Sequence, residues 1–236
     1  MVAWALLLAS CADGQDTTAD VGDSQAVTFE SADGVPLEGR LFGDGRTAVV
    51  LAHMLPADQS SWFSFAERLA DQGYLVLTFN FRGYCPGGDA GCSQGERDVS
   101  AIWQDELGAI DLVRSRGADR VALVGASMGG TASLVAGADP ALGIDAIVTL
   151  SAPMSIDGLV ADPAVLQRGG AAKLFVAGVG DATAAVAAED LYDASPPPKR
   201  VEIVPADDHG TDLLTGSQGE VVQRLIETYL AQFVPA

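Results

Sequence analysis

The chain has 236 residues, enough for one domain with a full hydrophobic core, and its apolar fraction of 48% is ordinary for a globular protein. Its formal net charge of −19 at pH 7, with only two lysines, argues against nucleic acid as a partner because such a surface repels phosphates. This acidity fits either a well-solvated surface or a protein adapted to high salt. No apolar run reaches the roughly 18 to 20 residues of a membrane-spanning helix.

The first residues have the pattern of an export signal. A short apolar stretch, residues 2–9, runs into the sequence Leu-Ala-Ser-Cys, which ends at Cys11 and resembles the bacterial lipoprotein signal. In that family the peptide is cut before the cysteine, and the cysteine carries the lipid. We therefore expect residues 1–10 to be a signal peptide and 11–25 a polar tether, with the protein anchored outside the cytoplasm through Cys11. No lysine or arginine precedes Cys11, which departs from the usual signal, and the alternative is an apolar terminus with a chance cysteine.

The other two cysteines lie close together in "RGYCPGGDAGCSQG". The glycines and the proline between Cys85 and Cys92 form a short loop that suits a disulfide, and such a bond persists outside the cytoplasm. A metal site is the alternative, but no further cysteine or histidine lies near enough in the sequence to complete one. The sequence therefore predicts a Cys85–Cys92 disulfide and no metal ion.

From residue 26 onward, strands alternate with helices. An opening antiparallel hairpin around Asp33 and Gly34 is followed by continuous apolar runs, which are typical of strands buried on both faces. Repeated strand–helix units predict an α/β fold with a mostly parallel central sheet, helices on both faces, and one domain over residues 26–236. We expect the hairpin at 26–31 and 36–43, strands at 47–52, 74–80, 120–124, 145–150, 173–177 and 200–204, and helices at 60–73, 98–117, from about 128, from about 183, and at 217–233.

Ser127 lies in the sequence Gly-Ala-Ser-Met-Gly, residues 125–129, between a buried strand and a helix. Strand, G-x-S-x-G, helix is the nucleophile elbow, a sharp turn that lifts the serine oxygen above the sheet. The helix N-terminus also directs backbone N–H groups and a partial positive charge at the reacting centre. The pattern therefore predicts Ser127 as a nucleophile.

A serine at its ordinary pKa needs a general base, and the chain has only two histidines. In the chain order Ser–Asp–His that accompanies this elbow, the base comes last. His209, between the last strand and the last helix, fits that order, whereas His53 precedes the serine. His209 is therefore the predicted base.

The third member of such a triad is an acid that orients the imidazole. Asp181, in the turn after the strand at 173–177, is the predicted acid. Asp157, after the strand at 145–150, is the alternative. Asp207 and Asp208 are too near His209 in sequence to reach its far nitrogen.

From about residue 26 to 233 the chain resembles the α/β-hydrolase family. The resemblance implies that the backbone N–H groups of Leu55 and Met128 form the oxyanion hole and that His53 is structural. Met54 replaces the glycine of the family's oxyanion loop, and Asn80 replaces an aspartate that is structural in the family. The matching segments, in order, are "HMLP" (53–56), "NFRGY" (80–84), "GASMG" (125–129), "GVGD" (178–181) and "DHG" (208–210).

Only about two dozen residues separate the strands at 145–150 and 173–177, where a cap domain would be inserted. That space fits one short helix and no lid. The chain therefore resembles the small capless esterases and the dienelactone-hydrolase-like branch, with serine where dienelactone hydrolases have cysteine. An open site suits esters with short or bulky exposed acyl groups.

The sequence thus predicts a serine hydrolase that cleaves small-molecule carboxylic esters through an acyl-enzyme and uses no metal or cofactor. A thioesterase, acyltransferase or peptidase would use the same triad. A non-catalytic exported binding lipoprotein on this fold is a further alternative, which an intact triad disfavours.

Overall fold

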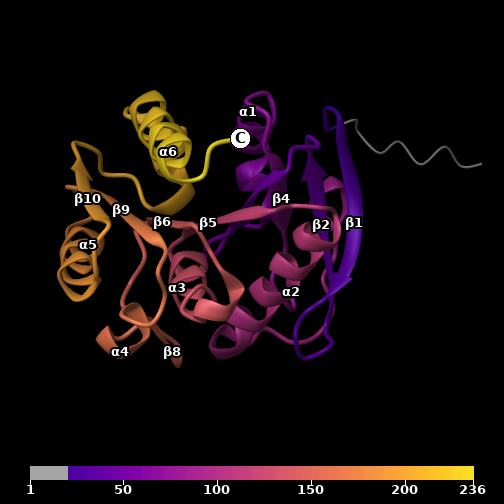
Figure 1. Ribbon diagram of the computed structural model, residues 1–236, viewed down its shortest axis with the longest axis horizontal. Helices are drawn as coiled ribbons and strands as arrows, with labels where there is room; N and C mark the ends of the chain where they lie inside the picture. Colours follow the sequence, from indigo (N-terminus) through magenta and orange to yellow (C-terminus); the bar gives the residue numbers. More distant parts are fainter. Residues whose placement is uncertain (1–20) are drawn as a thin grey trace, which may run out of the picture.

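The computed structural model describes residues 21–236, which form an eight-stranded sheet with helices on both faces (Figure 1). The strand order is β1-β2-β4-β3-β5-β6-β9-β10; β1 and β2 pair antiparallel, as do β2 and β4, and the remaining pairs are parallel. The sheet strands are β1 (Ser24–Glu30), β2 (Pro36–Phe42), β3 (Thr47–Ala52), β4 (Leu75–Phe79), β5 (Arg120–Ala126), β6 (Ala146–Leu150), β9 (Ala172–Gly178) and β10 (Lys199–Val204). The expected mostly parallel α/β fold is confirmed.

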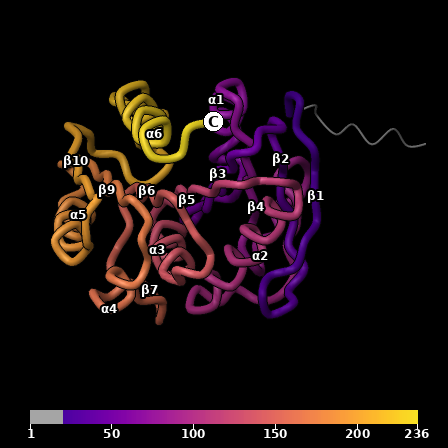
Figure 2. The backbone as a smooth tube through the Cα atoms, in the orientation of Figure 1, coloured from indigo at the N-terminus to yellow at the C-terminus, as the bar shows by residue number. Residues whose placement is uncertain are grey.

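Two helical layers bury the two faces of the sheet. Helices α1 and α6 cover one face, and α2, α3 and α5 cover the other (Figures 1 and 2). The inner strands β3, β4 and β6 are buried at every position, which explains their continuous apolar sequences. The helices are α1 (Phe63–Ala70), α2 (Ile102–Ser115), α3 (Met128–Ala136), α4 (Pro163–Leu166), α5 (Ala182–Ala194) and α6 (Gly219–Phe233).

The sheet begins slightly earlier than the sequence indicated. β1 starts at Ser24, which pairs with Phe42, so the last two residues of the expected tether 11–25 belong to the sheet. The expected signal peptide 1–10 and Cys11 lie outside the described residues. Between Val21 and Ala236, no helix has the length and apolar character needed to span a membrane.

The segment between β6 and β9 contains more structure than the single short helix expected. Besides α4, it forms a two-stranded hairpin of β7 (Ser155–Ile156) and β8 (Leu159–Val160). Strands of two residues are too short to show an alternating pattern, which is why the sequence did not reveal them. No cap domain is inserted between β6 and β9.

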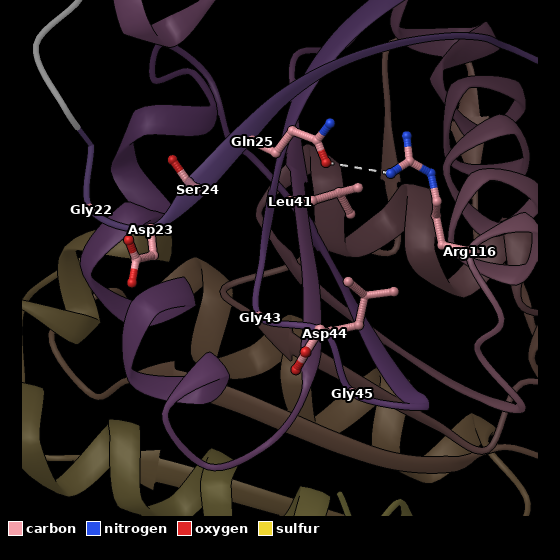
Figure 3. A pocket seen from close by; sticks show the side chains of 10 residues that line it. Gly22, Asp23, Ser24, Gln25, Leu41, Gly43, Asp44, Gly45 and Arg116 are labelled. Carbon is pink, nitrogen blue, oxygen red and sulfur yellow. Dashed lines mark hydrogen bonds between the residues drawn. The ribbon is translucent and has the colours of Figure 1, made fainter.

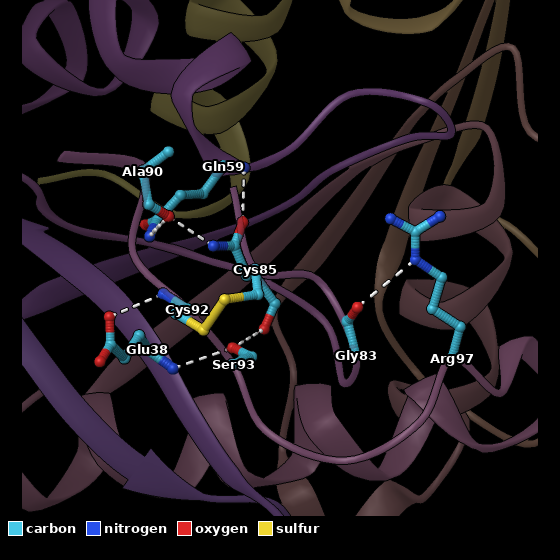
Figure 4. The surroundings of a disulfide bond; sticks show 9 residues. Glu38, Gln59, Gly83, Cys85, Ala90, Cys92, Ser93 and Arg97 are labelled. Atoms are coloured by element: carbon cyan, nitrogen blue, oxygen red, sulfur yellow. Dashed lines mark hydrogen bonds between the residues drawn. A yellow bond between two sulfur atoms is a disulfide. The ribbon is translucent and has the colours of Figure 1, made fainter. Parts of the chain in front are cut away.

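A disulfide loop follows β4, where Cys85 is bonded to Cys92 as predicted (Figure 4). The buried Asn80 holds this loop to the preceding one: its side-chain oxygen accepts from Gln59 N–H (3.0 Å), and its amide donates to the carbonyl of Ala90. Its backbone oxygen also accepts from the Ser93 hydroxyl (2.7 Å). Asn80 therefore joins the loop after β3 to the disulfide loop.

A buried carboxyl group joins α2 to α3, the helix that follows Ser127. Glu106 is fully buried, and its Oε1 accepts from the Ser133 hydroxyl at 2.7 Å. Its other oxygen has no partner among the described residues. Burial raises the pKa of Glu106 to about 8, so this carboxyl carries a proton at neutral pH.

Replacing Glu106 by glutamine is expected to remove a pH dependence of stability. The raised pKa means that Glu106 stabilises the fold fully below its ordinary pKa of 4.5 and loses that contribution as the pH rises to about 8. Each pH unit within this window costs about 1.4 kcal/mol. Urea unfolding at pH 5 and pH 8.5 should show the variant gaining stability relative to the wild type at the higher pH. A difference that does not change with pH would contradict a buried, protonated Glu106.

Candidate active site

Ser127 lies in a strained turn at the carboxyl edge of the sheet, between β5 and α3. Its φ of 49° is in the left-handed region, which residues with a Cβ rarely adopt, and it is 8% exposed. The turn brings backbone segments so close that only glycine fits beside it. A Cβ at Gly125 would collide with the backbone of Gly129, and one at Gly129 with the carbonyls of Ala52 and His53. This is the elbow geometry predicted from the sequence.

Two backbone N–H groups near the ends of β5 and β3 are the candidates for an oxyanion hole. Met128 is the first residue of α3, so its N–H has no acceptor within the helix. The carbonyl of Met54 accepts from His53 Nδ1 at 2.9 Å, and in a trans peptide the following N–H, of Leu55, points the opposite way. The role of these two N–H groups as oxyanion donors stays a prediction. Met54 occupies the glycine position of the motif with its side chain buried against Gly210.

His53 has both ring nitrogens occupied inside the protein. Phe81 N–H donates to Nε2 at 3.1 Å, which makes Nε2 the acceptor and Nδ1 the protonated nitrogen that donates to Met54. The ring is completely buried, and burial lowers its pKa to about 4. His53 is therefore neutral and holds the loop after β3 in place, as the family resemblance implied.

His209 is the exposed histidine, and Asp181 lies against it. The ring Nδ1 and Asp181 Oδ2 are 2.5 Å apart, and 44% of the histidine side chain is exposed. Asp181 is also the N-cap of α5, with Oδ1 accepting from Ala184 N–H at 3.3 Å. One carboxylate thus caps a helix with one oxygen and fixes the histidine ring with the other.

The other nearby acids face elsewhere. Asp207 lies against the backbone of Gly180, and Asp208 lies over Gly216. Asp157 is exposed at the tip of the β7–β8 hairpin. Among residues 21–236, Asp181 is the only acid paired with His209.

The histidine loop packs against the end of β5. Gly210, which follows His209, faces the Cβ of Ala126, the residue before Ser127. Its N–H donates to the hydroxyl of Ser151 at 3.1 Å. In the described part of the chain no hydrogen bond joins Ser127 to His209 directly, as is common for such pairs without a substrate.

Tyr84 connects the disulfide loop to this site. Its hydroxyl lies 3.9 Å from the sulfur of Met128, and the guanidinium of Arg97 lies over its ring, 4.2 Å from the centroid. Trp62, by contrast, is completely buried in the core on the α1 face. Both aromatic side chains thus belong to the core, and Tyr84 contacts the residue that follows Ser127.

A cavity of about 600 Å³ lies at the opposite, amino edge of the sheet (Figure 3). It is lined by the start of β1, the end of β2 and Arg116 at the end of α2, and it contains none of the residues above. In the part of the chain that the structure covers, no group of three or more histidine, cysteine, aspartate or glutamate side chains could hold a metal ion.

Sequence comparison finds a known family whose model spans Ser127, Asp181 and His209. The family model described as the alpha/beta hydrolase fold matches residues 47–210, which is more than half of the chain. The chain belongs to the alpha/beta hydrolase family.

Solved structures with this fold cover nearly the whole chain. The esterase Pf2001 of Pyrococcus furiosus is similar with a TM-score of 0.76 and 17% identity, over 93% of this chain and 97% of that one. A dienelactone hydrolase from Anabaena variabilis gives a TM-score of 0.71 and 21% identity, over 90% and 99%. A serine hydrolase without a lid from Xanthomonas campestris gives 0.68 and 21%, over 90% and 96%. At these identities the likeness establishes the fold.

Proposed function

We propose that this protein is a serine hydrolase that cleaves carboxylic esters through an acyl-enzyme. The observation that carries the proposal is the pairing of Asp181 with His209, whose loop packs beside the strained turn of Ser127. This arrangement provides a nucleophile, a base and an acid that orients the base. The esterases and the dienelactone hydrolase among the similar structures support the same reaction class.

In the proposed mechanism, Ser127 Oγ attacks the ester carbonyl while His209 Nε2 takes its proton. Asp181 holds the Nδ1–H tautomer and stabilises the imidazolium that forms. The N–H groups of Met128 and Leu55 bind the oxyanion, each worth roughly 10²–10³ in rate. His209 then protonates the leaving alkoxide, and a water activated by the same ring releases the acid.

The open surroundings favour small acyl groups. No lid forms between β6 and β9, and His209 is almost half exposed, so a long acyl chain would find little apolar surface to cover it. We therefore propose esters with short or bulky exposed acyl groups as substrates.

Two measurements test this function. Steady-state rates with p-nitrophenyl esters of increasing chain length, the matching thioesters and aminoacyl anilides should favour the short esters, whereas a preference for thioesters or anilides would identify a thioesterase or peptidase. A fluorophosphonate probe should label Ser127, and absence of labelling would favour a non-catalytic binding protein.

The proposed location is outside the cytoplasm, anchored through a lipid on Cys11. The disulfide between Cys85 and Cys92 supports an oxidising compartment. Mass spectrometry of the protein isolated from its source membranes under non-reducing conditions should find a diacylglycerol-modified Cys11 at the N-terminus and one internal disulfide. Release into the medium without lipid, or an uncleaved N-terminus, would contradict the anchor.

A further inference from the structure

Ser151 occupies the position on β6 that Ser127 occupies on β5. The two strands are parallel neighbours, and their last residues, Ala126 and Leu150, are register partners. Ser127 and Ser151 each come directly after the end of their strand. The N–H of Ser127 also donates to the carbonyl of Leu150 at 2.8 Å, so the two turns are bonded to each other.

The backbone of Ser151, like that of Ser127, has a positive φ. Its φ is 54°, against 49° for Ser127, and besides these two only Asp157 among the described non-glycine residues has a positive φ. Glycine is the default residue for this conformation because it has no Cβ. Ser151 is only 1% exposed, so solvation does not account for a hydroxyl here.

The Ser151 hydroxyl has a specific partner in the histidine loop. It accepts from the N–H of Gly210 at 3.1 Å, across 59 residues of sequence. The side chain of Met54 packs against Gly210 from a second side, where a Cβ would meet its sulfur. The peptide that follows His209 is therefore hydrogen-bonded to Ser151 and packed against Met54.

We propose that Ser151 is a positioning residue for His209, an inference that rests on the proposed hydrolase function. The ring of His209 is fixed by Asp181 at Nδ1, and its backbone is fixed by Ser151 through Gly210. Together the two anchors direct Nε2 toward Ser127. The strained serine supplies the hydroxyl that a glycine at this position would lack.

The test compares Ser151→Gly with Ser151→Ala. Both remove the hydroxyl, but glycine also relieves the positive φ and so keeps the turn foldable. If the hydroxyl positions His209, both variants lose about 10- to 100-fold in kcat and in the rate of fluorophosphonate labelling, with KM within about twofold, because small misplacements of a base have effects of this size. Asp157→Gly is the matched control: it relieves a positive φ nearby, on an exposed hairpin, and its rates should equal those of the wild type.

Amide exchange supplies a readout that does not depend on activity. The Gly210 N–H should be protected from hydrogen exchange in the wild type and exchange faster in Ser151→Gly, and the proton resonance of His209 Nδ1–H should broaden. The proposal would be overturned if Ser151→Gly were labelled by the fluorophosphonate as fast as the wild type. It would also be overturned if Asp157→Gly lost as much activity as Ser151→Gly. If the wild type is not labelled at all, the proposed hydrolase function is wrong. If the exchange rate of the Gly210 N–H is the same in Ser151→Gly and in the wild type, the proposed role of the Ser151–Gly210 hydrogen bond is wrong.

Discussion

Ser127→Ala is expected to lower kcat for ester hydrolysis by about 10⁶-fold, the loss that follows removal of the nucleophile from a serine hydrolase triad. The proposed nucleophile lies in a strained turn directly before Met128, the first residue of α3. What remains is the contribution of binding and of the oxyanion hole alone. The variant keeps its Cβ and the same φ, so the unfolding temperature should change little. The test measures kcat with p-nitrophenyl acetate and the thermal unfolding temperature of the purified variant.

Ser155→Ala provides the matched control for this experiment. Ser155 is exposed on the β7–β8 hairpin, so its replacement should leave both kcat and unfolding unchanged. If Ser127→Ala retains more than about a thousandth of the wild-type kcat, another group is the nucleophile. A folded variant with full activity would disprove the proposed mechanism outright.

Asp181→Asn should reduce kcat by about 10⁴-fold, because an asparagine stabilises the wrong histidine tautomer. Asparagine is also a good N-cap, so it preserves the second role of Asp181, accepting from Ala184 N–H at the start of α5. The substitution therefore separates the bond to His209 from the stability of the helix. Unfolding of the variant should occur within a few degrees of the wild type.

Asp157→Asn and Asp207→Asn are the comparisons, assayed at the same pH. Asp157 is exposed on its hairpin and Asp207 lies against Gly180, so both variants should retain near wild-type rates. A large loss in Asp157→Asn with a normal Asp181→Asn would transfer the acid to the strand β6. Normal rates in all three would mean that His209 works without an acid.

Hydrophobic patterning was sufficient to predict the architecture because the inner strands are buried on both faces and helices such as α1 and α6 bury one face. The observed bounds of β3, β4 and α6 differ from the expected ones by at most two residues. Patterning failed where elements are very short. The β7–β8 hairpin has two residues in each strand, and its shape depends on local turns rather than on periodicity.

The sequence allowed us to predict candidate site residues that directly follow a strand. It did not reveal a residue whose proposed role depends on a hydrogen bond to a second residue. Asp181 and His209 follow β9 and β10, neighbouring parallel strands whose carboxyl ends meet at one edge. Ser151 also follows a strand, but its relevance depends on a hydrogen bond to Gly210 that no spacing rule reveals. Glu106 was equally hidden, since its protonation follows from complete burial on a helix whose sequence is only weakly amphipathic.

The direction of β1 sets the edge of the sheet at which the N-terminal segment joins the domain. β1 and β4 run in the same direction on either side of β2, and Ser24 pairs with Phe42, which pairs with Val76 near the start of β4. Ser127 follows β5 at the other end of the strands. A five-residue strand such as β4 spans roughly 17 Å. If the proposed lipid holds the chain from its N-terminal side, the tether joins the domain at the amino edge, so Ser127 lies about the length of a strand away from the point of attachment.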